Sequence, residues 1–173
     1  MLDFAKIKLV CIDVDGTLTD GLYQMSNDGI LTKSFYTRDF YGIEQLLRKG
    51  LLVYIITQAQ DEVIQRQLFR LSGQSAFWCG HINDDRLLLT IECGDKLEQV
   101  ETVMKAKGWD WENVAYIGDA ENDAEVMDKV AFAACPADAI EELKKDINYI
   151  SDASGGRGAV YEIALYLLEK IGE

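Results

Sequence analysis

The apolar residues of this chain fall into two kinds of segment that alternate along it. Continuous apolar runs at 9–12, 51–56 and 114–117 are typical of strands buried on both faces of a parallel sheet. Between these runs, apolar residues recur three or four positions apart, which is the spacing of amphipathic helices. The helical segments are 38–49, 61–71, 96–107 and 159–171. This alternation predicts an α/β fold with a doubly wound parallel sheet.

Shorter elements complete the predicted fold. Residues 131–134 and 148–150 are expected to be short strands, and Pro136 to open a further helix. Asp28-Gly29 lies between strand-like arms and predicts a β-hairpin within 21–37. Because this hairpin follows the first strand directly, we expect a flap over its end, or else a subunit contact through its apolar side chains. We expect one domain over residues 1–173, without a large cap domain.

Two segments are predicted with less regular structure. Two extended runs about Asn83-Asp84-Asp85 predict a second hairpin within 76–92. The only histidine, His81, lies there, and a surface or interface role is favoured for it over catalysis. The glycine-rich segment 154–158 is predicted to be a mobile loop carrying Arg157.

Charge and cysteine content narrow the functional classes. The chain has 30 acidic and 17 basic residues, a net charge of -13, which is the wrong sign for binding nucleic acid or an anionic membrane. No apolar run approaches the length of a membrane span, and residues 1–10 are too short and too charged for a signal peptide. The four cysteines form no Cys-x-x-Cys pair, so reduced thiols in a cytoplasmic protein are expected. An anionic substrate would need a divalent cation or a few placed cationic groups.

The candidate chemistry begins at the end of the first predicted strand. Asp13 and Asp15 follow it one residue apart, and alternate residues of a strand share a face. Because neighbouring carboxylates repel one another, this pair indicates a cation, a proton or a catalytic task. The alternative is a solvated strand end without a function.

Further polar residues follow the other predicted strands. Thr57 ends the second apolar run, Lys96 begins a helix, and Asp119 and Asp123 follow the third run. In an open parallel sheet these positions converge on one crevice. Carboxylates with one hydroxyl and one ammonium suit Mg²⁺ holding a phosphate. One aspartate can attack phosphorus while another transfers protons, although the residue types alone do not say which does which.

The motifs resemble, in order, the four motifs of the haloacid dehalogenase superfamily. They are Asp13-Val14-Asp15-Gly16-Thr17, Thr57, Lys96 and Gly118-Asp119-x-x-Asn122-Asp123. The resemblance implies that Asp13 is the nucleophile and Asp15 the general acid and base. It implies that Thr57 and Lys96 bind phosphate and that Mg²⁺ is held by Asp119, the Asp13 carboxylate and the Asp15 carbonyl. Asp123 and Asn122 would support this site.

More narrowly, the chain resembles the capless branch that contains 3-deoxy-D-manno-octulosonate 8-phosphate and nonulosonate 9-phosphate phosphatases. The hairpin, Arg38-Asp39 and the segments 136–139 and 155–160 carry this resemblance. It implies a phosphorylated sugar acid as substrate, a homotetramer with the hairpin between subunits, and substrate contacts from Arg38, Asp39 and Arg157. Gln58-Ala59 replaces the Gly-Arg usual in the octulosonate enzymes, and the chain between Thr57 and Lys96 is about a dozen residues longer than usual.

Three functions are compatible with these residues. The leading one is a Mg²⁺-dependent phosphatase that forms an aspartyl-phosphate. A phosphomutase is disfavoured because no large cap domain is expected to exclude water. The alternative of another class is a catalytically idle domain of the same fold that holds an oligomer or a partner together.

Overall fold

A central parallel sheet organises the protein, and the predicted doubly wound α/β fold is confirmed. The computed structural model describes residues 2–60, 62–74 and 86–172. The strands of the sheet are β1 (Leu9–Ile12), β4 (Leu52–Ile56), β5 (Leu87–Thr90), β6 (Val114–Ile117), β7 (Phe132–Cys135) and β8 (Tyr149–Ile150). Their order is β5-β4-β1-β6-β7-β8, and all neighbours run parallel.

Strand β1 lies at the point where the sheet reverses its winding. Leu9 pairs with Leu52 of β4 on one side and with Val114 of β6 on the other. From β1 the chain builds the β4 side first and then the β6 side. Ligands of such sheets bind in the crevice outside the carboxyl ends at this point. The residues that follow β1, β4 and β6 are therefore the candidates for a ligand site.

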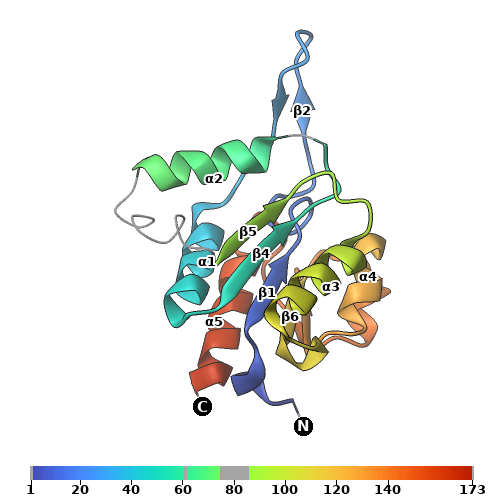
Figure 1. The fold of residues 1–173 in the computed structure, drawn as a ribbon. Coiled ribbons are helices and arrows are strands. Elements are labelled where there is room, and N and C mark those ends of the chain that lie inside the picture. The colour runs from blue at the N-terminus through green and yellow to red at the C-terminus, as the bar shows by residue number, and fades with distance from the viewer. Residues whose placement is uncertain (1, 61, 75–85, 173) are drawn as a thin grey trace.

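Helices cover both faces of the sheet (Figure 1). They are α1 (Thr37–Lys49), α2 (Val63–Gln74), α3 (Lys96–Lys107), α4 (Glu121–Met127) and α5 (Ala159–Gly172). Val10 and Ile12 pack in the core with α1 and α5, whereas Leu9 and Cys11 pack in the core with α3 and α4. Because both faces of β1 are buried, its apolar run is continuous rather than alternating.

Two helices end and begin as their sequences predict. Gly50 adopts φ 97° and its N–H bonds the carbonyls of Leu46 and Leu47, closing α1, which is the left-handed conformation that glycine adopts most easily. Asp95 caps α3 by accepting hydrogen bonds from the N–H groups of Leu97 and Glu98. This cap fixes where Lys96 enters the helix.

The predicted first hairpin is present. Strands β2 (Gln24–Met25) and β3 (Leu31–Thr32) pair antiparallel, and the hairpin projects beyond the end of the main sheet (Figure 1). The Ile30 N–H donates to the Ser26 hydroxyl oxygen, and Gly29 takes φ 77° in the turn. The exposed apolar side chains on the hairpin are those of Leu22, Tyr23, Met25 and Ile30.

Two expectations about the C-terminal part are wrong. Pro136 opens no α-helix; turns follow it, and then a 3₁₀-helix at Leu143–Lys145. The local N–H groups bond outside a helical pattern, since Ala137 donates to the Ala153 carbonyl and Ile140 to that of Asp119. The glycine-rich segment 154–158, predicted to be a mobile loop, is instead packed against the loop that follows β1. The contact is so close that a Cβ on Gly155 would overlap the carbonyl oxygen of Gly16.

The second predicted hairpin falls mainly on residues 75–85, which include Cys79 and His81 and lie outside the described residues. Its expected second arm, β5, pairs in parallel with β4 in the main sheet. The other three cysteines are buried free thiols, as predicted. Within the described ranges, every helix is too short or too polar to cross a membrane.

Candidate active site

The two aspartates after β1 have different surroundings. Asp13 is only 4% exposed, and its N–H donates to the Ile117 carbonyl at the end of β6. Asp15 lies at the rim, where its carboxylate accepts from the Thr19 hydroxyl at 3.1 Å and from the Lys33 ammonium at 2.6 Å. The pair therefore comprises one buried and one accessible carboxylate.

Lys96 is the cation at the floor of the site. Its ammonium donates to Asp13 Oδ1 at 2.5 Å and to Asp123 Oδ1 at 2.6 Å, and its side chain is 1% exposed. Burial alone would lower the pKa of Lys96, but the charges of Asp13 and Asp123 raise it above its usual value. A cation at the first position of a helix opposes the helix dipole, so the ion pairs must hold it there.

Asp123 is saturated with hydrogen-bond donors. One of its oxygens accepts from Lys96 and from the Tyr116 hydroxyl at 2.7 Å, and the other accepts from the N–H groups of Asp119 and Ala120. It is completely buried. Asp123 thus holds Lys96 and the turn after β6 in place, and its lone pairs are largely used.

Asp119 is the less encumbered carboxylate of the pair after β6. Its Oδ1 accepts from the Thr17 hydroxyl at 3.0 Å. Gly16 makes room for it, because a Cβ there would overlap the Asp119 carboxylate. Burial raises the pKa of Asp119 to about 6; the Thr17 hydrogen bond opposes this shift, and the charge of Asp123 adds to it.

The acidic cluster fits a hard metal ion. Oxygens of Asp13, Asp119 and Asp123 lie within 4.8 Å of one another. Burial, followed by the charge of Asp123, also raises the pKa of Asp13 well above its usual value, with Lys96 opposing. Oxygen ligands at this density suit a divalent cation such as Mg²⁺. Since Asp123 is occupied by four donors, Asp13 and Asp119 are the side chains that could hold the ion.

Thr57 and Asn122 frame the cluster from neighbouring elements. Thr57 follows β4 and is buried, with its hydroxyl oxygen accepting from the Ala59 N–H at 3.0 Å. This leaves the hydroxyl proton available to a ligand. Asn122 is exposed and donates to the Gln58 side chain, which in turn donates to the Gly94 carbonyl. Asn122 thus joins the loops at the rim by bonding Gln58 rather than the acidic cluster.

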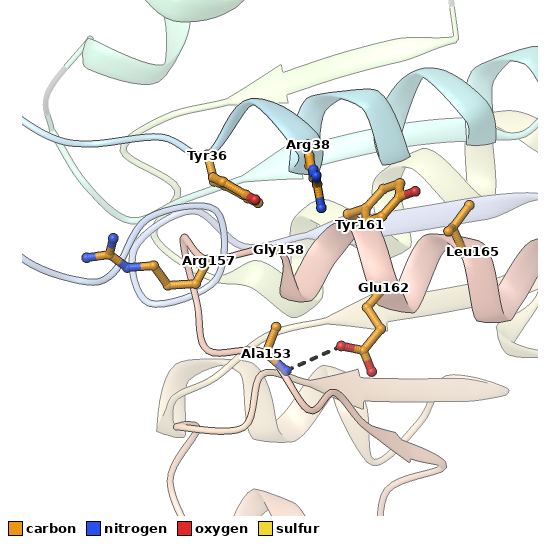
Figure 2. A pocket seen from close by; sticks show the side chains of 8 residues that line it. All are labelled: Tyr36, Arg38, Ala153, Arg157, Gly158, Tyr161, Glu162 and Leu165. Carbon is orange, nitrogen blue, oxygen red and sulfur yellow. Dashed lines mark hydrogen bonds between the residues drawn. The ribbon is translucent and has the colours of Figure 1, made fainter.

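Arg38 and Arg157 line a separate cavity of about 300 Å³ between α1 and α5. Figure 2 shows Arg38 directed toward Tyr161, whereas the Arg157 guanidinium points away from Arg38. Arg157 donates to Asp20 at 3.2 Å, next to the loop that carries Asp15. Arg157 thus contacts the loop that follows β1, whereas Arg38 lines the cavity between α1 and α5, and neither belongs to the acidic cluster.

Asp39 is completely buried. Its carboxylate accepts from the N–H groups of Gly158 at 3.3 Å and Tyr161 at 2.9 Å, at the start of α5. The structure gives this predicted substrate contact a position inside the protein, facing backbone rather than solvent.

Sequence reasoning missed four partners of the acidic residues. Thr17 and Thr19 were seen only as part of a motif, although their hydroxyls bond Asp119 and Asp15. Tyr116 could have been noticed, since a tyrosine inside a buried strand usually needs a hydrogen-bond partner. Lys33 has no such signal, because only the folded hairpin carries it back to Asp15.

The family model of haloacid dehalogenase-like hydrolases matches residues 53–163, which are more than half of the chain. The chain belongs to the haloacid dehalogenase-like hydrolase family. The expected superfamily is therefore confirmed, with the motif order and the site geometry in agreement.

Several similar proteins are named as phosphatases of a sugar acid phosphate. The chain is 36% identical over 163 residues to 3-deoxy-D-manno-octulosonate 8-phosphate phosphatase KdsC of Escherichia coli, covering 94% of this chain and 80% of that protein. A structure of the Moraxella catarrhalis phosphatase of that name, in complex with magnesium, phosphate and KDO, has a TM-score of 0.83 and 27% identity, covering 97% of this chain and 89% of that one. A cobalt-bound form from Haemophilus influenzae has a TM-score of 0.82 and 28% identity, covering 98% and 92%. The prediction of an enzyme of phosphatase type is confirmed by these matches.

Proposed function

We propose that this haloacid dehalogenase-like hydrolase is a Mg²⁺-dependent phosphatase of a phosphorylated sugar acid. The observation that carries the proposal is the placement of Asp13, a buried carboxylate between the Lys96 ammonium and the Asp119 carboxylate. This arrangement offers a nucleophile, a cation for phosphoryl oxygens and an acidic metal site at one point of the sheet.

In the proposed reaction, a carboxylate oxygen of Asp13 attacks phosphorus and the bond from phosphorus to the sugar oxygen breaks. Asp15 gives its proton to that leaving oxygen, so the sugar acid departs with a hydroxyl group. Water then attacks the aspartyl-phosphate, Asp15 takes up the water proton, and the bond between Asp13 and phosphorus breaks. The accessible position of Asp15 at the rim, against the burial of Asp13, supports this division of roles.

Asp13 and Asp119 would hold Mg²⁺ together with the backbone carbonyl of Asp15. When bound, the ion supplies positive charge that screens the nucleophile from an anionic phosphate. Asp123 keeps Lys96 oriented, and we assign Lys96 and the Thr57 hydroxyl to the phosphoryl oxygens.

The substrate class is proposed from the relatives, which act on 3-deoxy-D-manno-octulosonate 8-phosphate according to their names. The rim of this site differs from the usual pattern, because Gln58 joins Asn122 and Gly94 where a glycine is expected. We therefore propose a sugar acid phosphate, with an octulosonate or nonulosonate skeleton. A homotetramer is proposed as well, supported by the exposed apolar side chains of the hairpin.

The test is phosphate release from 3-deoxy-octulosonate 8-phosphate and nonulosonate 9-phosphates, with Mg²⁺ or with EDTA. We expect Mg²⁺-dependent turnover that Asp13→Asn lowers by more than about 10³-fold, since it removes the nucleophile. Turnover that survives this substitution would refute the role of Asp13. Absence of turnover on every substrate, with a folded oligomer by light scattering, would instead favour the catalytically idle domain.

A further inference from the structure

The buried carboxylate of Asp39 lies outside the acidic cluster but is connected to it through the segment that precedes α5. Asp39 belongs to the first turn of α1, and its oxygens accept from the N–H groups of Gly158 and Tyr161. The first N–H groups of a helix have no partner within it. Asp39 supplies that partner for α5 from another helix.

The segment just before α5 lies on the loop that follows β1. We name residues 153–158 the glycine loop and residues 13–20 the acidic loop. The Gly156 N–H donates to the Thr17 carbonyl at 3.0 Å. A Cβ on Gly155 would overlap the Gly16 carbonyl oxygen, and one on Gly156 would crowd the Asp20 nitrogen. The two loops therefore touch backbone to backbone, with no side chain between them to absorb a shift.

The acidic loop in turn orients the reactive carboxylates. The Thr17 hydroxyl donates to Asp119 and the Thr19 hydroxyl donates to Asp15. Both threonines are completely buried. A displacement of the glycine loop would move the backbone that carries these two donors.

Two further carboxylates hold the other end of the glycine loop. Asp138 accepts from the Gly155 N–H at 2.8 Å. Glu162 accepts from the Ala153 N–H at 3.3 Å, the bond drawn in Figure 2, and from the Ser151 hydroxyl. The loop is thus fixed on one side by Asp138 and Glu162 and on the other by Asp39.

We propose that Asp39 is a positioning residue for the phosphatase site, because its carboxylate fixes the start of α5 and thereby presses the glycine loop against the acidic loop. This inference rests on the proposed function. It replaces direct substrate contact by Asp39 with an effect on the placement of Asp15 and Asp119.

The test is Asp39→Asn, which keeps the shape of the side chain but turns one acceptor oxygen into a donor facing an N–H group. With p-nitrophenyl phosphate and Mg²⁺, we expect kcat to fall between about 10- and 100-fold, the effect of a small misplacement of reacting groups, with KM changed by less than about twofold. A raised KM with unchanged kcat would overturn the proposal and indicate substrate contact. An unchanged kcat and KM would overturn it too.

Glu44→Gln is the matched control. Glu44 lies on the same helix, is 1% exposed and pairs with Arg48, so its neutralisation should leave kcat unchanged. If Asp39→Asn does not fold, Asp39→Ser keeps one acceptor oxygen for the helix start and replaces it in the assay.

Hydrogen exchange distinguishes failure of this inference from failure of the proposed function. The amides of Thr17 and Gly156 should exchange faster in Asp39→Asn than in the wild type and in Glu44→Gln. If the wild type releases no phosphate, the proposed function fails, and unchanged exchange at these amides would overturn the positioning role independently.

Discussion

Two aspartates among the described residues, Asp39 and Asp123, are completely buried. Their carboxylates are stabilised by different kinds of hydrogen-bond donor. Asp123 lies in the first turn of α4, after β6. Its carboxylate accepts hydrogen bonds from the Lys96 ammonium at 2.6 Å, from a tyrosine hydroxyl and from two backbone N–H groups. Asp39 lies in the first turn of α1, and its carboxylate is held by backbone N–H groups at the start of α5. Burial raises the pKa of Asp39 to about 6, although the N–H groups of Tyr161, Gly158 and Val160 oppose the shift.

The two aspartates differ in the strength of the positive charge that faces them. A buried ion pair with saturated hydrogen bonds holds its charges together, and removing one partner leaves the other unpaired in a medium of low polarity. A helix start offers only partial positive charge. The acidic cluster is therefore a set of mutually dependent charges, whereas the carboxylate of Asp39 is held by the partial charges of backbone N–H groups.

Removing the shared cation should produce the largest effect. Lys96→Met would leave Asp13 and Asp123 buried without their ammonium, and we expect the free energy of unfolding to fall by about 3–5 kcal/mol. Urea unfolding followed by circular dichroism measures this change. Phosphatase turnover should be lost as well.

The matched control lies on the same helix. Lys105 pairs with Glu101 at 3.2 Å, and the Lys105 side chain is 78% exposed. Lys105→Met should change the free energy of unfolding by less than about 1 kcal/mol. If the two substitutions had equal effects, the acidic cluster would not depend on the Lys96 charge.

The pH dependence of the free energy of unfolding should reveal the raised pKa of Asp39. Its pKa is 3.8 in the unfolded chain and about 6 in the folded protein, so the folded state binds more protons between these values. The contribution of Asp39 to stability is then fully present below pH 3.8 and is lost as pH rises through about 6, in total on the order of 3 kcal/mol.

Asp39→Asn should remove this contribution, whatever its effect on stability at one pH. The measurement is urea unfolding of wild type and variant, without Mg²⁺, at several values between pH 4 and pH 7. The difference in the free energy of unfolding between the two proteins should change with pH across this window. A constant difference would mean that Asp39 titrates alike in the folded and unfolded states, and the comparison with Asp123 would lose its basis.

The sequence was sufficient for the sheet and for the acidic residues at its end. The run at Leu9–Ile12 is continuously apolar because both faces of the strand are buried. The flanking helices show helical spacing because each buries one face. Asp13, Lys96, Asp119 and Asp123 were predicted because the carboxyl ends of parallel strands converge. Such local patterns are visible without a structure.

The residues that were missed or misplaced depend on contacts between distant segments. Lys33 meets Asp15 only through the geometry of the hairpin, and Asp39 meets Tyr161 across a separation of 122 positions. Pro136 looked like a helix start, but the N–H groups after it bond to Ala153 and Asp119. Tertiary hydrogen bonds of this kind leave no periodicity in the sequence.

The smallest predicted effect tests how far Asp123 depends on its neutral donors. Tyr116→Phe removes one hydroxyl from Asp123 but leaves Lys96 and two N–H groups, so the free energy of unfolding should fall by about 1.5 kcal/mol, the lower end for a bond to a charged group. Tyr54→Phe is the control, because Tyr54 is also buried, on β4 at the other side of β1, and bonds the uncharged Thr90 hydroxyl at 2.8 Å. The loss there should be smaller, about 0.5–1 kcal/mol. A loss at Tyr116 as large as that of Lys96→Met would mean that Asp123 depends on the hydroxyl as much as on the ammonium.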